Sequence, residues 1–309
     1  MQGLKWFVGA LALLALACGE VSGPSTPVVR DGEGLLELPL VSTSAGRSYK
    51  LVGATFAITG PQNVTITDTS ADSVSQPLMA GTYSIQMNGD WHVERTDAPG
   101  VTVPVTLVSP NPMTFTLGEG EARPVRFLFK VPEDGTANVG IGVDSGGWIS
   151  GTLKFEPPSP PRDGPVGIFA DLIGKSVPFV ISYESATVTR IQENGPKQAR
   201  IQTSPVTFQL GGAVPAKVMQ QFVAALQGRT LDFVVTASGW GYSYVVNMPL
   251  ENTEIGVRLD LRLQMLTVGA DADGYPLLVP TPFQLGEAQL VSSGGAARAS
   301  LYEGTFAPR

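Results

Sequence analysis

The chain has 309 residues, of which 27 are acidic and 20 basic, so its formal net charge is −7. This mildly acidic balance, without a basic cluster, argues against binding to nucleic acids or to anionic lipid surfaces. The chain is 43% hydrophobic, enough for folded cores, and its 36 glycines, 25 prolines and 15% charged residues are typical of many short strands joined by turns. We therefore expect a mainly β protein with two domains.

The first residues of the chain predict a secretory signal. Lys5 supplies a short basic region, an uncharged apolar stretch runs from Trp6 to Leu16, and small residues precede the only cysteine, Cys18. The apolar stretch has about 12 residues, whereas a membrane-spanning helix needs roughly 20. Residues 1–17 are therefore predicted to be a signal peptide.

The run Ala15-Leu-Ala-Cys18 resembles the lipobox of bacterial lipoproteins. In that family the cysteine is diacylated on sulfur and becomes the mature N-terminus, so the resemblance implies lipidation of Cys18. The commonest lipobox has leucine where this chain has Ala15, which the family pattern tolerates. Gly19 follows the cysteine in place of aspartate, which in this family resembles the signal for export to the outer membrane. The alternative is an ordinary secretory signal that leaves Cys18 as a free thiol.

The next part of the chain predicts a tether and a first domain. Residues 18–34 are rich in Gly, Pro and Ser, which we interpret as a flexible tether. Over 35–156 apolar and polar residues alternate between turn signals, which predicts an antiparallel β-sandwich of about eight short strands. The strand expected over 125–131, for example, places its valines and phenylalanines on one face and its basic residues on the other.

One strand of this first domain has a family likeness. The run from Leu78 to Ile85 (Leu-Met-Ala-Gly-Thr-Tyr-Ser-Ile), which continues to Trp91, resembles the L-x-P-G-x-Y-x-V strand of transthyretin-like and carboxypeptidase-regulatory-like domains. Ala80 replaces the family's proline, and the similarity covers only residues 78–91. It implies a small β-sandwich that acts as a stalk or adhesive module, with no catalytic residues to carry over.

The second half of the mature chain predicts a spacer and a second β-rich domain. Residues 157–165 contain five prolines in nine positions, which favours a semi-rigid polyproline spacer. The second domain is expected over 166–309, as another antiparallel β-sandwich-like domain. Residues 215–227 break its strand pattern, since they begin with proline, precede Gly228 and repeat apolar residues at helical spacing. We predict one α-helix there, packed against a sheet with its apolar face in the core.

Few residues of this chain suggest catalysis. His92 is the only histidine and the chain has one cysteine, which excludes multi-histidine and cysteine-based zinc sites. Neither a Gly-x-Ser-x-Gly motif nor a phosphate-binding glycine motif is present, so no catalytic residues are predicted. Carboxylates that lie close in sequence, such as Glu94 with Asp97 or Asp232 with Glu251, leave a polysaccharide hydrolase as an alternative.

Two groups remain as candidate binding residues. Asp271 and Asp273 precede a glycine as in the core of a calcium loop, but further oxygen ligands at the required spacing are missing, and a plain turn is the other interpretation. The run Trp240-Gly-Tyr242-Ser-Tyr244 offers aromatic rings that stack on a sugar or a protein partner, unless they pack inward from a hairpin turn.

Together these features predict an outer-membrane lipoprotein with a non-catalytic structural or binding role in the cell envelope. Its expected partners are the membrane, through the lipid on Cys18, and an envelope protein or glycan. Neither nucleic acid nor a cofactor is expected. The alternatives are a secreted or envelope polysaccharide hydrolase and a calcium-dependent adhesin, which would use Asp271 and Asp273.

Overall fold

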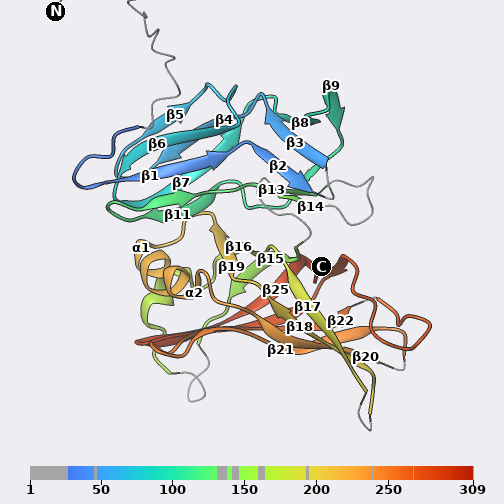
Figure 1. The fold of residues 1–309 in the computed structure, drawn as a ribbon. Coiled ribbons are helices and arrows are strands. Elements are labelled where there is room, and N and C mark those ends of the chain that lie inside the picture. Colours follow the sequence, from blue (N-terminus) through green and yellow to red (C-terminus); the bar gives the residue numbers. More distant parts are fainter. Residues whose placement is uncertain are drawn as a thin grey trace, which may run out of the picture.

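Most of the folded chain consists of antiparallel strands, arranged as an upper and a lower unit, which confirms the mainly β class (Figure 1). The predicted signal peptide, Cys18 and most of the tether lie outside the described residues. Within these residues no helix has the length and apolarity needed to cross a membrane. The computed structural model describes residues 27–44, 47–130, 138–140, 146–158, 164–192, 195–238, 240–266 and 268–308.

The first unit packs two layers of strands around one core (Figure 1). One layer contains, in order, β5 (Val64–Ile66), β4 (Thr55–Thr59), β7 (Gly81–Asn88) and β11 (Met113–Leu117). The other contains β12 (Ala122–Pro124), β1 (Glu33–Pro39) and β6 (Ser73–Met79), with β2 (Val41–Ser44), β3 (Arg47–Val52), β8 (His92–Arg95) and β9 (Ala98–Val103) beside them. A small third sheet contains β10 (Thr106–Leu107), β13 (Leu128–Lys130) and β14 (Asn138–Gly140).

Alternation of apolar and polar residues explains how these strands face their core. In β1 every second residue is buried, including Leu36 and Leu38, because successive side chains of a strand point to opposite faces. Tyr83 of β7 and Phe115 of β11 are cross-strand partners, and their rings stack with centroids 5.5 Å apart. The first unit therefore has the sandwich-like construction expected from its sequence pattern.

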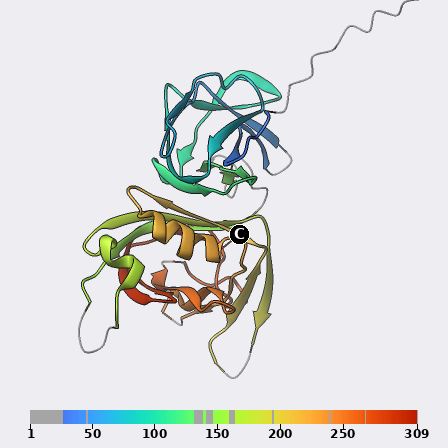
Figure 2. The same cartoon turned by 90° about the vertical axis from the view of Figure 1, so that its left-hand side faces the viewer.

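The second unit is built from a strongly curled sheet (Figure 2). The first strands of this sheet are β15 (Trp148–Phe155), β16 (Ser176–Tyr183), β17 (Ala186–Ile191), β18 (Gln198–Thr203) and β19 (Val206–Gly211). The later strands are β20 (Asp232–Ala237), β21 (Ser243–Asn252), β22 (Val257–Leu266), β23 (Thr281–Phe283), β24 (Gly286–Ser292) and β25 (Gly295–Ala307). Along the sheet the order is β17-β18-β20-β21-β22-β24-β25-β15-β16-β19, with β23 against β25.

A long hairpin with a bend in its middle joins the two ends of this sheet. Two residues separate β16 from β17, and two residues separate β18 from β19. On one side of the bend β16 pairs with β19, and on the other side β17 pairs with β18. The outer edge of β16 pairs with β15, whereas the outer edge of β18 pairs with β20. At the bend the Ser204 hydroxyl accepts hydrogen bonds from the N–H groups of Glu184 and Ser185, both at 3.1 Å. The hairpin therefore connects the two ends of the run of strands from β20 to β15, so that the sheet closes on itself.

The predicted helix is present and covers the inside of the curled sheet (Figure 2). It runs from Ala216 to Leu226 as α1 (Ala216–Val218), a wider π-helical turn (Met219–Val223) and α2 (Ala224–Leu226). The ring of Phe222 lies 5.1 Å from that of Phe169, which belongs to a short 3₁₀ turn, and 6.3 Å from that of Phe208 in β19. The apolar face of the helix is core, as predicted.

Strand pairing and core packing divide the two units upstream of the predicted 157–165 spacer. The first core ends at Phe129 and the second begins at Ile149 of β15, a strand that pairs with β16 and β25. The predicted spacer therefore follows the first strand of the second unit along the chain, and residues 159–163 of it lie outside the described residues. Proline-rich composition marks a connection that lacks backbone donors, but it does not tell which connection separates two cores.

Strand pairing and a buried amide join the two units. β11 pairs with β19, with Met113 opposite Gly211 and Thr114 opposite Leu210. Beside this pairing, the Gln209 amide donates to the backbone carbonyl of Arg126 at 2.8 Å, and its oxygen accepts from the Ser109 hydroxyl at 3.1 Å. The side chain of Gln209 thus satisfies polar groups of the first unit in a place that excludes water.

We predict that Phe222→Ala destabilises the second unit by about 3–5 kcal/mol, since it removes a fully buried ring from between two others. The measurement is urea unfolding followed by circular dichroism. The exposed neighbour Gln221 offers a matched control, and Gln221→Ala should leave the midpoint nearly unchanged. Equal midpoints for the two variants would contradict the core role of the helix.

We predict that Gln209→Ala costs about 1–3 kcal/mol, because it leaves the Ser109 hydroxyl and the Arg126 carbonyl without their partner. Chemical unfolding measures the loss, and limited proteolysis between the units reports whether they separate. The exposed Gln289 of β24 serves as control, since Gln289→Ala removes the same side chain from a solvated position. A Gln209→Ala protein as stable as this control would show that the amide does not join the units.

Candidate functional site

The two aspartates proposed as calcium ligands face a guanidinium group. In the connection after β22, the Asp271 carboxylate lies 2.5 Å from Arg190 Nη2, and the Asp273 carboxylate lies 3.1 Å from Arg190 Nη1. The other Asp271 oxygen accepts the backbone N–H groups of Asp273 and Tyr275, at 3.0 and 2.9 Å. This pattern is an Asx turn, and the cation that neutralises it is Arg190.

Two cations and an aromatic ring complete this cluster. Arg190 and Lys197 both lie over the Tyr275 ring, 4.6 and 5.1 Å from its centroid, and Lys197 Nζ donates to the Asp273 carbonyl. Nowhere in the described part of the chain do three or more His, Cys, Asp or Glu side chains gather as a metal site would require. The cluster therefore acts as a clamp that holds the 268–276 connection against β17 and β18.

The carboxylates considered for a hydrolase are each held separately by other groups. Glu94 accepts from His92 and from the Gly100 backbone, both at 2.8 Å, and Asp97 binds Arg95. These hydrogen bonds, led by that from Gly100 for Glu94 and that from Arg95 for Asp97, hold the pKa of both carboxyls below their ordinary values. A catalytic acid requires a raised pKa, so these two groups are poor candidates for the role.

The second such pair is also split between cationic partners. Asp232 binds Arg200, whereas Glu251 lies 3.8 Å from Arg258. Asp232 and Glu251 thus belong to two different ion pairs.

The aromatic run lies at the turn between β20 and β21. The Ser238 hydroxyl accepts from the N–H groups of Trp240 and Tyr242, at 3.2 and 3.4 Å, and the Ser238 N–H donates to the Tyr242 carbonyl. Trp240 is 87% exposed, and Tyr242 and Tyr244 are half-buried. For Trp240, the inward-packing alternative is therefore wrong, because the hairpin turn carries this ring out into solvent.

A groove lies beside this turn, on the outer face of β18, β20 and β21, with a cavity volume of about 550 Å³. Tyr244 is the cross-strand partner of Thr236, one of the lining residues, so the aromatic run adjoins the groove. Alternation along the strands sends the neighbouring residues into the core and leaves most of the lining residues outside, whereas Phe233 is buried in the core. The groove is lined by Ile191, Gln198, Arg200, Asp232, Phe233, Val234, Thr236, Val246, Asn247 and Pro249.

The charges in this groove neutralise one another. Arg200 binds Asp232 through two parallel hydrogen bonds, 2.8 Å from Nε and 2.5 Å from Nη2, and Gln202 adds a third at 3.2 Å. The Arg200 hydrogen bond lowers the pKa of Asp232, and the same bond raises the pKa of Arg200. The pair is therefore formed above the ordinary aspartate pKa and is lost only as the pH falls through the lowered value. At neutral pH the groove carries a fixed ion pair and no net charge from it.

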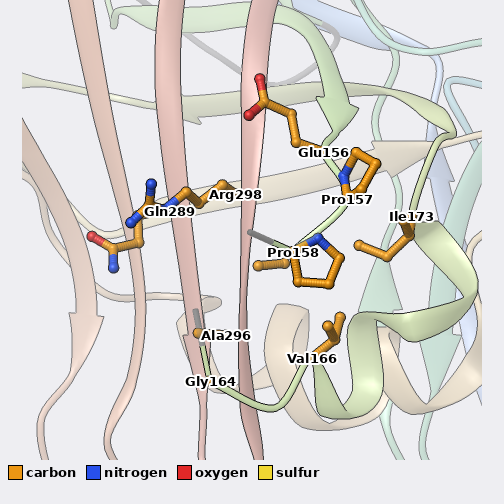
Figure 3. A pocket seen from close by; sticks show the side chains of 10 residues that line it. Glu156, Pro157, Pro158, Gly164, Val166, Ile173, Gln289, Ala296 and Arg298 are labelled. Atoms are coloured by element: carbon orange, nitrogen blue, oxygen red, sulfur yellow. The ribbon is translucent and has the colours of Figure 1, made fainter. Parts of the chain in front are cut away.

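Two further hollows lie on the outer face of β22, β24 and β25. The smaller, of about 90 Å³, has an apolar side formed by Pro158, Val166 and Ile173, from which the Glu156 carboxylate is turned away (Figure 3). The larger, of about 300 Å³, shares Glu156 and is strongly polar. Its other lining residues are Asp260, Arg262, Glu287, Ala288, Gln289, Arg298, Ala299 and Ser300.

The residues of these two hollows, and most residues of the groove beside Trp240, were not predicted from the sequence. The residues come from strands that are distant in sequence, and only the strand register brings them to one face. Alternation within each strand marks which side chains face outward, and that is the one signal the sequence carried.

Comparison with known proteins adds no assignment. A scan against protein-family models, a search of curated proteins and a search of solved structures each give no match. The interpretation of the site therefore depends on the geometry and chemistry of its own residues.

We predict that millimolar calcium leaves the thermal unfolding midpoint unchanged, because Arg190 already neutralises Asp271 and Asp273. Differential scanning calorimetry with calcium, with magnesium and with chelator measures this. Arg190→Ala is expected to lower the midpoint, since it releases the 268–276 connection. A midpoint that rises with calcium but not with magnesium would restore the calcium-dependent adhesin as an interpretation.

Proposed function

We propose that this chain is an outer-membrane lipoprotein, anchored through Cys18, with a non-catalytic binding role in the cell envelope. The observation that carries the proposal is the run Ala15-Leu-Ala-Cys18 at the end of a short apolar stretch, with Gly19 after it. Several acyl chains on one cysteine would attach the protein stably, whereas a single chain binds a membrane only marginally. The anchor and the folded units then have separate tasks.

The chain order supports a role in which the second unit is presented away from the anchor. The described residues begin at 27, shortly before β1 of the first unit, and the second unit follows it (Figure 1). A tether that precedes β1 would thus attach to the first unit. The groove beside Trp240 belongs to the second unit, so binding there would not compete with the anchor.

A non-catalytic role is supported by the state of the carboxylates. Glu94, Asp97 and Asp232 each have a lowered pKa because hydrogen-bond donors hold the charged form. General acid catalysis requires the opposite perturbation. The exposed Trp240 and the adjoining groove instead offer a surface for recognition.

The proposal predicts that Cys18→Ser abolishes lipidation and membrane retention. The intact mass of the membrane-extracted protein should show an acylated chain that starts at Cys18, and the variant should appear in the soluble fraction without the acyl mass. The variant should unfold at the same urea concentration as the parent, because Cys18 precedes both cores. An unmodified chain that starts at Cys18 and fractionates as soluble would overturn the lipoprotein assignment and favour a secreted protein.

A further inference from the structure

We propose that the groove on the outer face of β18, β20 and β21 binds a neutral glycan chain. This inference depends on the binding role proposed above and names its ligand class. Four features of the groove favour such a ligand: its apolar and aromatic surface, its planar polar side chains, the absence of net charge from its ion pair, and its position on a sheet face rather than at a sheet edge.

The groove presents apolar and aromatic surface to solvent. Val246 is 63% exposed on β21, and Val234 lies on the adjacent strand β20 within the same groove. Tyr244, the cross-strand partner of Thr236, extends this surface toward the hairpin turn that carries the exposed Trp240. A sugar ring has a face of C–H groups that packs on such a surface, and aromatic side chains supply large contact areas at little conformational cost.

Planar polar side chains accompany this surface. Gln198 donates to the Thr236 hydroxyl at 3.2 Å, and the exposed Asn247 lines the same groove. Each amide carries donors and an acceptor side by side, which matches the hydroxyl groups of a sugar. A few fixed polar groups on a largely apolar surface are what orient a ligand in a binding site.

The charge of the groove disfavours anionic ligands. Arg200 uses two guanidinium N–H groups on Asp232, and the pair contributes no net charge. Recognition of phosphate or of an acidic peptide needs cationic groups that reach the ligand. A neutral polyhydroxylated chain, by contrast, uses the ion pair as fixed donors and acceptors without requiring it to open.

The position in the sheet disfavours an extended peptide. A peptide that adds a strand needs a free sheet edge, but β20 pairs with β18 along residues 232–236 and with β21 at residues 235–237. Between these two strands the groove-lining stretches 232–234 and 246–247 lack a ladder partner, which is too little for an added strand, so side chains are the main groups left to bind a ligand. Side-chain recognition across a rigid sheet face suits a glycan laid over the strands.

The test uses the full-length protein in detergent, with cellohexaose, chitohexaose, laminarihexaose and mannohexaose as neutral probes, and isothermal titration calorimetry as the measurement. We expect at least one probe to bind, with an affinity insensitive to salt. Trp240→Ala combined with Tyr244→Ala should weaken that binding tenfold or more, as for aromatic anchors of an interface. Both side chains lie outside the cores, so the double variant should keep its thermal midpoint.

Tyr302→Ala is the matched control, because Tyr302 is a partly exposed tyrosine on β25, outside the groove. Binding that survives the double variant, or no binding by any of the four probes, would overturn the glycan proposal. Tight binding of heparin that is lost with added salt and with Arg200→Ala would also overturn it, in favour of an anionic ligand. Fractionation is scored separately, so an acylated protein that binds no glycan refutes only this inference, and a soluble protein that binds glycan refutes only the anchor.

Discussion

The second unit depends on one constraint, the double pairing of its long bent hairpin. The arm formed by β16 and β17 and the arm formed by β18 and β19 stay hydrogen-bonded to each other, yet they take different outer neighbours, β15 and β20. Because these neighbours are the two ends of a run of consecutive antiparallel strands, the sheet must curl until it meets itself. The Ser204 hydroxyl stabilises the bend by accepting hydrogen bonds from the N–H groups of Glu184 and Ser185, which lie between the two strands of one arm.

The same constraint sets the surroundings of the sheet. β20 pairs with β18 but not with β19, so the outer edge of β19 is open to other partners. The end of that edge pairs with β11 of the first unit, and the segment around Gly228 and Arg229 hydrogen-bonds to its beginning at Val206. The helix between β19 and β20 follows from this geometry, because its apolar face fills the inside of the curl. The Gln209 amide accepts a hydrogen bond from the Ser109 hydroxyl and donates one to the Arg126 carbonyl, which lie where the two units meet.

Local signals predicted what depends on neighbours in sequence. Spacing identified the helix over 215–227, and alternation identified the buried set Val125, Phe127 and Phe129. The prediction of a single strand over 125–131 is wrong, since residues 125–127 lie between β12 and β13 and belong to neither. The contacts of the sites depend on register instead: Arg190 meets Asp271 across 81 residues and Arg200 meets Asp232 across 32. Such residues can be selected from the sequence, but their partners cannot be predicted, because a one-residue shift in strand register moves every side chain of the strand to the opposite face of the sheet. The division between the units could not be predicted for a related reason. The sequence pattern of β15 is like that of the strands before it, and only its pairing with β16 and β25 shows that it belongs to the second unit.

Closure of the sheet also limits the chemistry by which the second unit recognises a ligand. Pairing uses most of the backbone groups of β18, β20 and β21, and their inward side chains are packed in the core. Only the outward side chains remain, and there the Arg200–Asp232 pair removes the free charge that would attract an ion. What is left is shape, apolar area and neutral hydrogen bonding, all held by rigid strands. Such a surface gains little from electrostatic steering, so its selectivity must come from contact, in which the exposed Trp240 beside the groove has the largest area to offer.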